Sequence, residues 1–355
     1  MKTPALELTI AITALDESSI IVKNIKEIKV WLGKNIPLIS FEILVIDDGS
    51  TDGMGQLLDN LASKDKFLRV VHHQTNLGRG RGVRTAFREA KGEFLILLDA
   101  DLSYAPEHIA KLLEPLKRDE ADITIASPYH DKGVVRNVPF TRLFLSRWGN
   151  RILSKSYKNN IKTVTSIVRG YRREVVDQLE LINDEKDLHL ELLYKAELLG
   201  FRLKEIPAKL IWRDRKRGKS SNSGQGYFRN NPFIKMRSVI VSHFIFNFVT
   251  KPKILFLGPV LLGMLIFLYG ASSLTWLIIK GFLNGDINPI RQTLIDGQLT
   301  LILTSASFII SIFFIFIFFI ASQAKKYFEE QYILSSRSHY LLKKIADKKL
   351  SKDSK

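Results

Sequence analysis

Residues 94–104 read FLILLDADLSY, and two carboxylates follow directly on a run of five apolar residues. A short apolar run of this kind is typical of a strand that is buried on both faces of a parallel sheet. Asp99 and Asp101 stand where that strand ends. Because aspartate is common in turns, the pair alone fits an ordinary turn as well as a site in which two carboxylates bind a cation.

The residues upstream repeat this arrangement of an apolar run followed by polar side chains. Three more short apolar segments precede it: 6–12 (LELTIAI), 41–47 (FEILVID) and 67–72 (FLRVVH). The stretches between the segments have the apolar spacing of helices: 17–32, 53–63 and 81–91. Strands that alternate with helices predict βαβ units and a mostly parallel sheet, which is an α/β fold.

Polar residues gather where the predicted strands end, and in parallel sheets this edge binds the ligand. They are Asp16 and Glu17, Asp47 and Asp48, His72 and His73, and the pair Asp99 and Asp101. The first strand continues into TALDE instead of a glycine-rich turn, which argues against a dinucleotide-binding enzyme, and a Walker P-loop is absent. A glycine-rich stretch, NLGRGRGVRTAF (76–87), precedes a predicted helix whose amides and arginines can meet an anion.

Composition restricts the metal chemistry and the partners. The 355 residues include no cysteine, so disulfides and thiolate metal sites are excluded. The seven histidines are scattered, which disfavours a zinc site and makes His72 and His73 sheet-end residues. The net charge of +17 indicates an anionic partner. Its excess lies mainly in residues 202–253, with 13 Lys and Arg against two acids.

Two uncharged apolar segments predict a membrane hairpin near the C-terminus. Residues 254–279 and 299–322 each exceed the roughly 20 residues that span a bilayer core. Basic residues flank the pair on its outer sides, at Lys251, Lys253, Lys325 and Lys326. The positive-inside rule then places both termini in the cytosol. The N-terminus does not predict a signal peptide, because Glu7 interrupts a very short apolar stretch.

These features divide the chain into four parts: a soluble domain (1–225), a juxtamembrane segment (226–253), two membrane helices (254–324) and a basic cytosolic tail (325–355). The juxtamembrane sequence mixes cations such as Arg229 and Lys235 with Phe and Ile. That mixture predicts short amphipathic helices in the membrane interface. An ordinary surface helix is the alternative.

The ordered motifs resemble those of the family 2 glycosyltransferases with the GT-A fold, in the branch that acts on polyprenyl phosphates. The matching motifs in the first half are TALDES (13–18), DDGSTD (47–52), NLGRGRGVRTAF (76–87) and DAD (99–101). Those in the second half are HDKGVVRNVPFTRLFLSRWGNRI (130–152), SIVRGYRREVV (166–176), DLHLELLYKAELLGFRLKEIPA (187–208) and IWRDRKRGKSS (211–221). The resemblance implies a Rossmann-like sheet domain and covers nearly the whole chain.

The resemblance implies a reaction in which a hexose passes from a nucleotide-sugar, UDP-glucose or GDP-mannose, to a polyprenyl (dolichyl or undecaprenyl) phosphate, with inversion. It implies donor binding by Thr13, Ala14, Asp16, Glu17, Asp47, Asp48, Gly78, Arg84, Asp99, Ala100 and Asp101. Asp99 and Asp101 would hold Mg²⁺ or Mn²⁺, ions that suit carboxylate and phosphate oxygens. The acceptor phosphate would meet Arg142, Arg169, Arg213, Arg215 and Arg217. With Asp99 and Asp101, Arg142 and Arg213 are the candidate catalytic residues.

Some positions depart from the family pattern. Ile167 replaces a glycine in an acceptor-side turn, and Pro128 stands where an arginine is usual. Glu191 matches a family acidic position, where it either contacts the donor sugar, holds the arginine-rich loop or belongs to a solvated helix face. A homo-oligomer is compatible with the sequence.

Two other functions compete with this reading. One is a processive membrane glycan synthase, although the nearest string to its Q-x-x-R-W motif, Leu145 to Trp148, lacks the glutamine. The other is a non-catalytic basic protein that binds the membrane surface. A nucleic-acid partner is not expected, because most of the positive charge lies beside the membrane segments.

Overall fold

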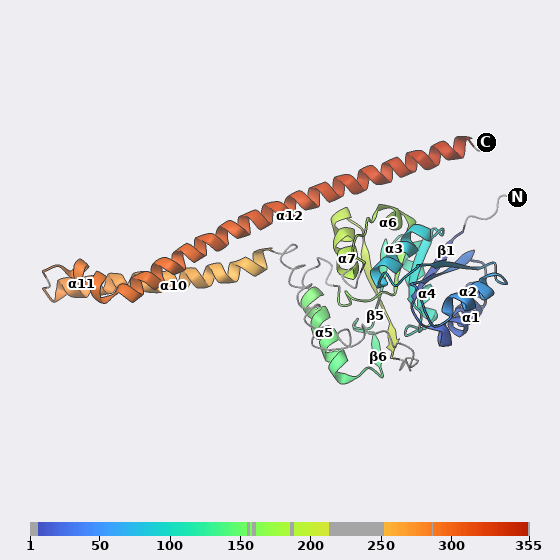
Figure 1. The fold of residues 1–355 in the computed structure, drawn as a ribbon, viewed down its shortest axis with the longest axis horizontal. Coiled ribbons are helices and arrows are strands. Elements are labelled where there is room, and N and C mark those ends of the chain that lie inside the picture. The colour runs from blue at the N-terminus through green and yellow to red at the C-terminus, as the bar shows by residue number, and fades with distance from the viewer. Residues whose placement is uncertain are drawn as a thin grey trace. The chain divides into compact units, whose positions relative to one another are not determined.

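The computed structural model describes residues 6–154, 157, 161–184, 188–212, 252–285 and 287–353. The chain forms two compact units. The first comprises residues 1–223 and 333–355, and the second comprises residues 224–332. Figure 1 shows the elements of both units along the chain.

A seven-stranded mixed sheet forms the centre of the first unit, with strand order β3-β2-β1-β4-β7-β5-β8. Its strands are β1 (Leu8–Ala14), β2 (Phe41–Asp47), β3 (Leu68–His72), β4 (Phe94–Asp99), β5 (Ile123–Ser127), β7 (Arg169–Arg172) and β8 (Leu203–Pro207). All neighbouring pairs are parallel except those of β7, which runs antiparallel to β4 and β5. The predicted α/β fold with a mostly parallel sheet is therefore confirmed.

Helices connect these strands and cover the sheet. They are α1 (Ser18–Asn35), α2 (Met54–Ala62), α3 (Arg79–Glu89), α4 (Glu107–Lys117), α5 (Phe140–Ser154), α6 (Arg173–Gln178) and α7 (Leu188–Leu199). The Phe87 ring of α3 packs edge-on against Tyr171 of β7, whereas a Cβ at Gly170 would approach Leu116 of α4. Because neighbouring strand residues face opposite sides, α3 and α4 cover opposite faces of the sheet.

The register of the parallel strands aligns the predicted site residues along one edge. Ala14 pairs with Asp47, Asp47 pairs with His72, and Thr13 pairs with Asp99. The central strands β1, β2 and β4 are buried and mostly apolar up to this point, and the polar side chains gather where these strands end. The sheet therefore brings the polar ends of four strands into one row.

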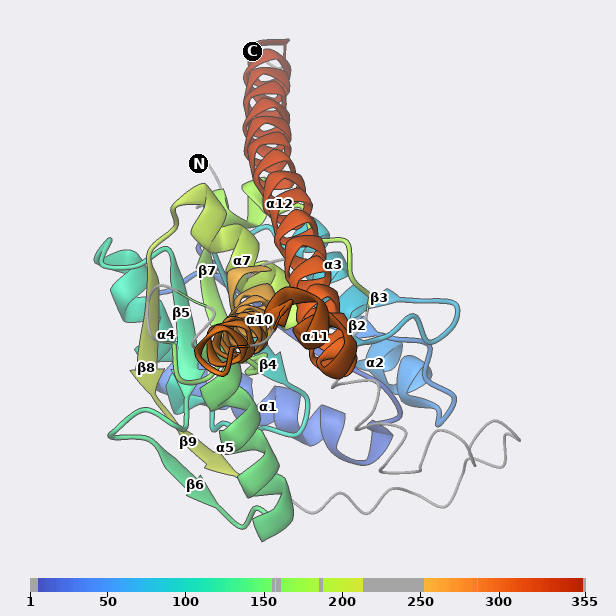
Figure 2. The same ribbon diagram turned by 90° about the vertical axis from the view of Figure 1, so that its left-hand side faces the viewer.

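A small second sheet lies beside this edge. It pairs β6 (Val134–Arg136) with β9 (Lys209–Ile211) in parallel. The Ile211 amide donates to the Ser103 carbonyl at 3.0 Å, and the Trp212 amide donates to the Arg136 carbonyl at 3.0 Å. These bonds hold the chain before Arg213 next to the turn that contains Asp101. Figure 2 shows β6 and β9 together with α5.

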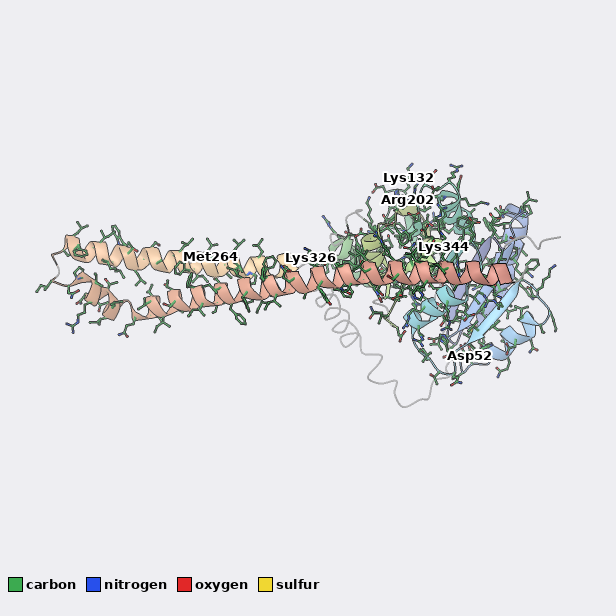
Figure 3. All side chains as sticks on the ribbon, turned by 90° about the horizontal axis from the view of Figure 1, so that it is seen from above. Asp52, Lys132, Arg202, Met264, Lys326 and Lys344 are labelled. Atoms are coloured by element: carbon green, nitrogen blue, oxygen red, sulfur yellow. The ribbon has the colours of Figure 1, made fainter. Side chains whose placement is uncertain are left out.

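Two helices are long and apolar enough to cross a membrane, and their apolar parts lie in the second unit. They are α10 (Pro252–Leu283) and α12 (Gln298–Asp353), and the short helix α11 (Pro289–Asp296) lies between them. The candidate spans lie in Phe256–Leu283 and Gln298–Ala346, and an 18-residue stretch within each reaches a mean hydropathy of 1.9 and 2.6, respectively. Apolar side chains such as Met264 project from α10 in Figure 3. Two candidate spans are thus present as predicted, whereas the juxtamembrane segment lies almost entirely outside the described residues.

Small residues bring α10 and α12 close together. A Cβ at Gly263 would lie 2.3 Å from Ser311 Oγ, and one at Gly270 would lie within contact of Thr304. Gly263 and Gly270 are seven residues apart, which is two turns of the same helix face. Close approach through small residues is how helices associate in membranes, where apolar burial gives little gain.

Candidate active site

The turn after β4 holds Asp99 and Asp101 in different environments. Asp99 is half-buried at the end of the strand, while Asp101 is buried. Asp101 Oδ1 accepts hydrogen bonds from the Ser103 amide (2.9 Å) and the Ser103 hydroxyl (2.8 Å). Leu102 adopts a φ of 49°, and its amide donates to the Asp99 carbonyl. Ser103 therefore fixes the orientation of the Asp101 carboxylate.

The carboxylates of this turn suit a divalent cation that also binds phosphate. Within the described part of the chain, no group of three or more His, Asp, Glu or Cys side chains forms a metal cage. Mg²⁺ is commonly bound through one or two carboxylates together with substrate phosphates, so a pair of aspartates fits this mode of binding. Buried Tyr104 lies nearby, and burial together with the negative charge of Asp99 raises its pKa. The Tyr104 phenol consequently stays protonated beside the turn.

Each aspartate at the end of β2 is contacted by a histidine at the end of β3: His72 is its last residue and His73 follows it. The Asp47 carboxylate contacts His72 Nδ1 at 2.9 Å and accepts a hydrogen bond from the Ser50 amide. The Asp48 carboxylate contacts His73 Nδ1 at 2.7 Å. His73 Nε2 in turn lies 2.9 Å from the Thr85 hydroxyl of α3. The histidines are sheet-end residues, as predicted, and they orient the two carboxylates.

Asp48 also organises the glycine-rich stretch before α3. Its carboxylate accepts hydrogen bonds from the Leu77 and Gly78 amides, both at 3.0 Å. Gly78 has a φ of 96°, which glycine adopts without strain. Asp48 and Gly78, two predicted donor-binding residues, are thus in direct contact.

The turns after β1 and β2 are joined by reciprocal hydrogen bonds. The Asp16 amide donates to Ser50 Oγ at 3.0 Å, and the Asp16 carboxylate accepts from the Thr51 amide at 2.8 Å. Asp52 accepts from the Ser18 amide. Partial burial of Asp52 raises its pKa, but the hydrogen bond from the Ser18 amide and other hydrogen bonds outweigh burial. The net effect is a lowered pKa of Asp52. Thr13 and Ala14 end β1 and Glu17 follows in the turn after it, so the predicted donor residues of β1 and β2 lie together.

The first turn of α3 is bound by the loop that contains Ile182 and Asp184. The amides of Gly80 and Arg81 donate to the Asp184 carbonyl, at 2.8 and 3.2 Å. Arg84 Nη1 contacts the Asp184 carboxylate at 2.5 Å and the Ile182 carbonyl at 2.9 Å. The amides that the sequence suggested for an anion therefore have a protein partner here. The sequence did not reveal Asp184, because it lies in a loop without a motif.

The buried side chains of Glu191 and Lys195 bind the backbone of the loop at residues 180–184. Their side chains are 9% and 4% exposed, with Lys195 Nζ 2.5 Å from Glu191 Oε1. Glu191 also accepts from the amides of Ile182 (2.8 Å) and Asn183 (2.9 Å), and Lys195 donates to the Glu180 carbonyl. Glu191 thus holds the loop of residues 180–184. The sequence analysis did not name Lys195, although the spacing of four residues on a helix was a signal that could have revealed the pair.

The predicted acceptor arginines lie in different environments, and three of them lie outside the described residues. Arg169 is fully buried, and its Nη2 donates to the Val164 carbonyl at 2.6 Å. Because its guanidinium is enclosed by the described residues, we leave Arg169 out of the acceptor site proposed below. Arg142 lies on α5. Arg213, Arg215 and Arg217 lie outside the described residues.

The contacts of His72 predict a pH-dependent stability. Partial burial disfavours its charged form, but hydrogen bonds and charges from Asp47 and Asp59 outweigh burial and raise its pKa above 6.5. The stabilisation by charged His72 is then complete below about pH 6.5 and is lost as the pH rises through the raised pKa. We expect His72→Gln to lower the melting temperature more at pH 6 than at pH 9. An equal decrease at both pH values, measured by thermal unfolding, would contradict this.

Comparison with known proteins identifies the family of the chain. The model of glycosyl transferase family 2 matches residues 9–180. Polyprenol monophosphomannose synthase of Mycolicibacterium smegmatis is 35% identical over 207 residues, which cover 54% of this chain and 77% of that protein. Undecaprenyl-phosphate mannosyltransferase of Micrococcus luteus is 30% identical over 189 residues, 52% of this chain and 76% of that protein.

Further matches are partial or more distant. Dolichol-phosphate mannosyltransferase of Pyrococcus furiosus is 30% identical over 209 residues, 58% of this chain and 57% of that protein. Among solved structures, glucosyl-3-phosphoglycerate synthase from Mycobacterium tuberculosis aligns at 18% identity with a TM-score of 0.47, over 68% of this chain and 78% of that one. From the family match and the identity to the Mycolicibacterium protein, the chain belongs to glycosyl transferase family 2.

Proposed function

We propose that the protein transfers a hexose from a nucleotide-sugar to a polyprenyl phosphate at the cytosolic face of a membrane and inverts the anomeric configuration. The observation that carries this proposal is the row of polar strand ends, Asp47 to Asp99, in a chain with two candidate membrane spans. Three relatives are named as mannose transferases or synthases acting on polyprenol, dolichol-phosphate or undecaprenyl-phosphate. Of the two candidate donors, these names favour GDP-mannose over UDP-glucose.

The donor site is proposed at the ends of β1, β2 and β4. Asp47 and Asp48, oriented by His72 and His73, would accept hydrogen bonds from the base or ribose. Asp99 and Asp101 would hold a Mg²⁺ or Mn²⁺ ion at the diphosphate, and that ion supplies Lewis-acid stabilisation of the leaving phosphate. Ser103 would keep the Asp101 carboxylate in place during turnover.

The acceptor does not require a general base from the protein. The second pKa of a phosphate monoester is about 6, so the acceptor is mostly a dianion at pH 7 and already a nucleophile. The protein must supply cations that hold this dianion beside the sugar. We propose Arg142 and the stretch that begins at Arg213 for this role, because Ile211 and Trp212 tie the start of that stretch to Ser103 and β6. Guanidinium groups suit phosphate through paired N–H donors.

The proposed membrane topology places the first unit, called the catalytic unit below, and both termini in the cytosol. Basic residues flank the spans on the outer sides of the hairpin, whereas the predicted connection between them, residues 280–298, balances Lys280 and Arg291 against Asp286 and Asp296. Since the chain lacks cysteine, single cysteines can report this topology. A membrane-impermeant thiol reagent should label Ile287→Cys in intact cells but not Leu38→Cys; the reverse pattern would refute the orientation.

A donor panel with the purified full-length protein tests the reaction. The assay combines polyprenyl phosphate with GDP-mannose or UDP-glucose, in Mg²⁺, Mn²⁺ or EDTA. We expect one monoglycosylated lipid, formed from GDP-mannose and abolished by EDTA. A ladder of longer products would support a processive synthase, and the lack of a glycolipid with every donor and metal would refute the proposal.

A further inference from the structure

Helix α5 exposes three large aromatic side chains on one face. Phe140, Phe144 and Trp148 are 80%, 58% and 59% exposed. They are spaced by four residues, so they project from successive turns of the helix on the same side. Large aromatic side chains that gather on a surface in this way mark a contact with a partner or a membrane.

Cations accompany the aromatic face. Arg147 and Arg151 of α5 are exposed, and with Lys162 they line an open cavity of about 430 Å³ at the end of β5. Asp131 contributes the carboxylate of the cavity and pairs with Lys162. The Arg147 guanidinium also lies 6.0 Å from the ring centre of Tyr129. Arg147 and Arg151 remain to attract an anion.

We propose that α5 lies in the interface of an anionic membrane, with Phe140, Phe144 and Trp148 among the upper acyl chains. Arg147 and Arg151 then contact lipid phosphates. Aromatic residues on one helix face with cations beside them are the pattern of helices that lie in a membrane interface, and Trp is enriched at that depth. A lipid surface is favoured over a second copy of the chain, because copies would bring the same cations together, whereas anionic headgroups neutralise them.

This contact would orient the catalytic unit. The Tyr129 hydroxyl donates to Ser146 Oγ at 2.7 Å, which ties α5 to the end of β5. Because β4 and β5 both run antiparallel to β7, they are parallel to each other, and their carboxyl ends share an edge. Docking of α5 therefore turns the edge that carries Asp99 toward the membrane. This membrane contact would form whichever sugar the protein transfers.

A nitroxide label measures this contact in the full-length protein. The chain has no native cysteine, so Phe144→Cys can be labelled alone and compared with Leu38→Cys. Leu38 is 98% exposed and precedes β2 at the opposite edge of the sheet. The proteins are reconstituted in vesicles of phosphatidylglycerol and phosphatidylcholine, and collisions with oxygen and with a water-soluble nickel complex give the depth of each label.

The expected depth at position 144 is about 5–10 Å below the headgroups, while position 38 stays in water. Adding Arg147→Ala and Arg151→Ala should lower the ratio of immersed to water-exposed label at position 144 by about fivefold per arginine. The proposal is overturned if both labels meet the nickel complex equally in anionic vesicles. It is also overturned if spin–spin broadening shows that position 144 packs against a second copy.

Discussion

Replacement of both Asp99 and Asp101 by asparagine is expected to lower turnover by about 10³-fold or more while the protein stays folded. A bound divalent ion stabilises developing charge by several kcal/mol, and each 1.36 kcal/mol is a factor of ten in rate. Asparagine keeps the size of both side chains and an oxygen that accepts from Ser103. The measurement is the initial rate of glycolipid formation at saturating donor, with melting temperature as a check on folding.

Glu107→Gln is the matched control for this experiment. Glu107 lies in the first turn of α4, which follows the Asp99 turn, and its side chain is 51% exposed. The same change from acid to amide should leave the rate near that of the wild type. If the double asparagine variant kept full activity at all metal concentrations, the metal role of the pair would be refuted. A non-catalytic membrane binder would keep its membrane binding after the change, whereas a metal-dependent glycosyltransferase would lose turnover, so the variant separates the two functions.

The strands and helices of the first hundred residues were predictable because their signals are local. The apolar segment at 41–47 is β2, and the segment that ends at Asp99 is β4. The predicted helix at 53–63 is α2, Met54–Ala62. An apolar run or a helical period requires no knowledge of distant residues. The second half gave weaker signals, and there the motif resemblance contributed more than periodicity.

Strand β7 illustrates what local patterns do not reveal. It consists of Arg169–Arg172 and has two arginines in four residues, yet it lies between β4 and β5. Its place depends on long-range pairing, Leu97 with Arg169 and Ile125 with Arg169. Gly170 suits this position, since a Cβ there would lie 2.6 Å from Thr124 Oγ1. The sequence therefore indicated the sheet but not its antiparallel member.

The site was predictable as a set of strand ends, although the partners of its carboxylates were not. Parallel strands align their carboxyl ends, so the row from Asp47 to Asp99 followed from strand order. The contacts of Asp48 with His73 and of Arg84 with Asp184 depend on register and on a loop about 100 residues away in sequence. Helix α12 likewise continues beyond the predicted span at 299–322, aided by ion pairs such as Lys326–Glu330.

Removal of the Glu191 carboxylate is expected to cost about 3–5 kcal/mol in the free energy of unfolding. Glu191→Ala leaves the charge of buried Lys195 without its carboxylate partner, and breaking a buried ion pair from one side has this cost. It also removes the acceptor for the Ile182 and Asn183 amides. Lys195→Met should cost less, because those amides continue to stabilise the Glu191 carboxylate. Chemical denaturation of the full-length protein in detergent measures both variants.

An exposed pair with the same spacing provides the control. Glu107 and Lys111 lie four residues apart on α4, 3.4 Å between charged atoms and each 51% exposed, so Glu107→Ala should change stability by less than about 1 kcal/mol. Loss of Glu191 should also release the loop of residues 180–184 from Arg84 and α3, which raises the KM for the donor. Faster amide exchange at Gly80 and Arg81 would report that release directly, because their amides donate to Asp184. If amide exchange at Gly80 and Arg81 stayed at the wild-type rate while stability fell, Glu191 would contribute only to the stability of the fold. The proposed connection from Glu191 through the loop of residues 180–184 to α3 would then be refuted.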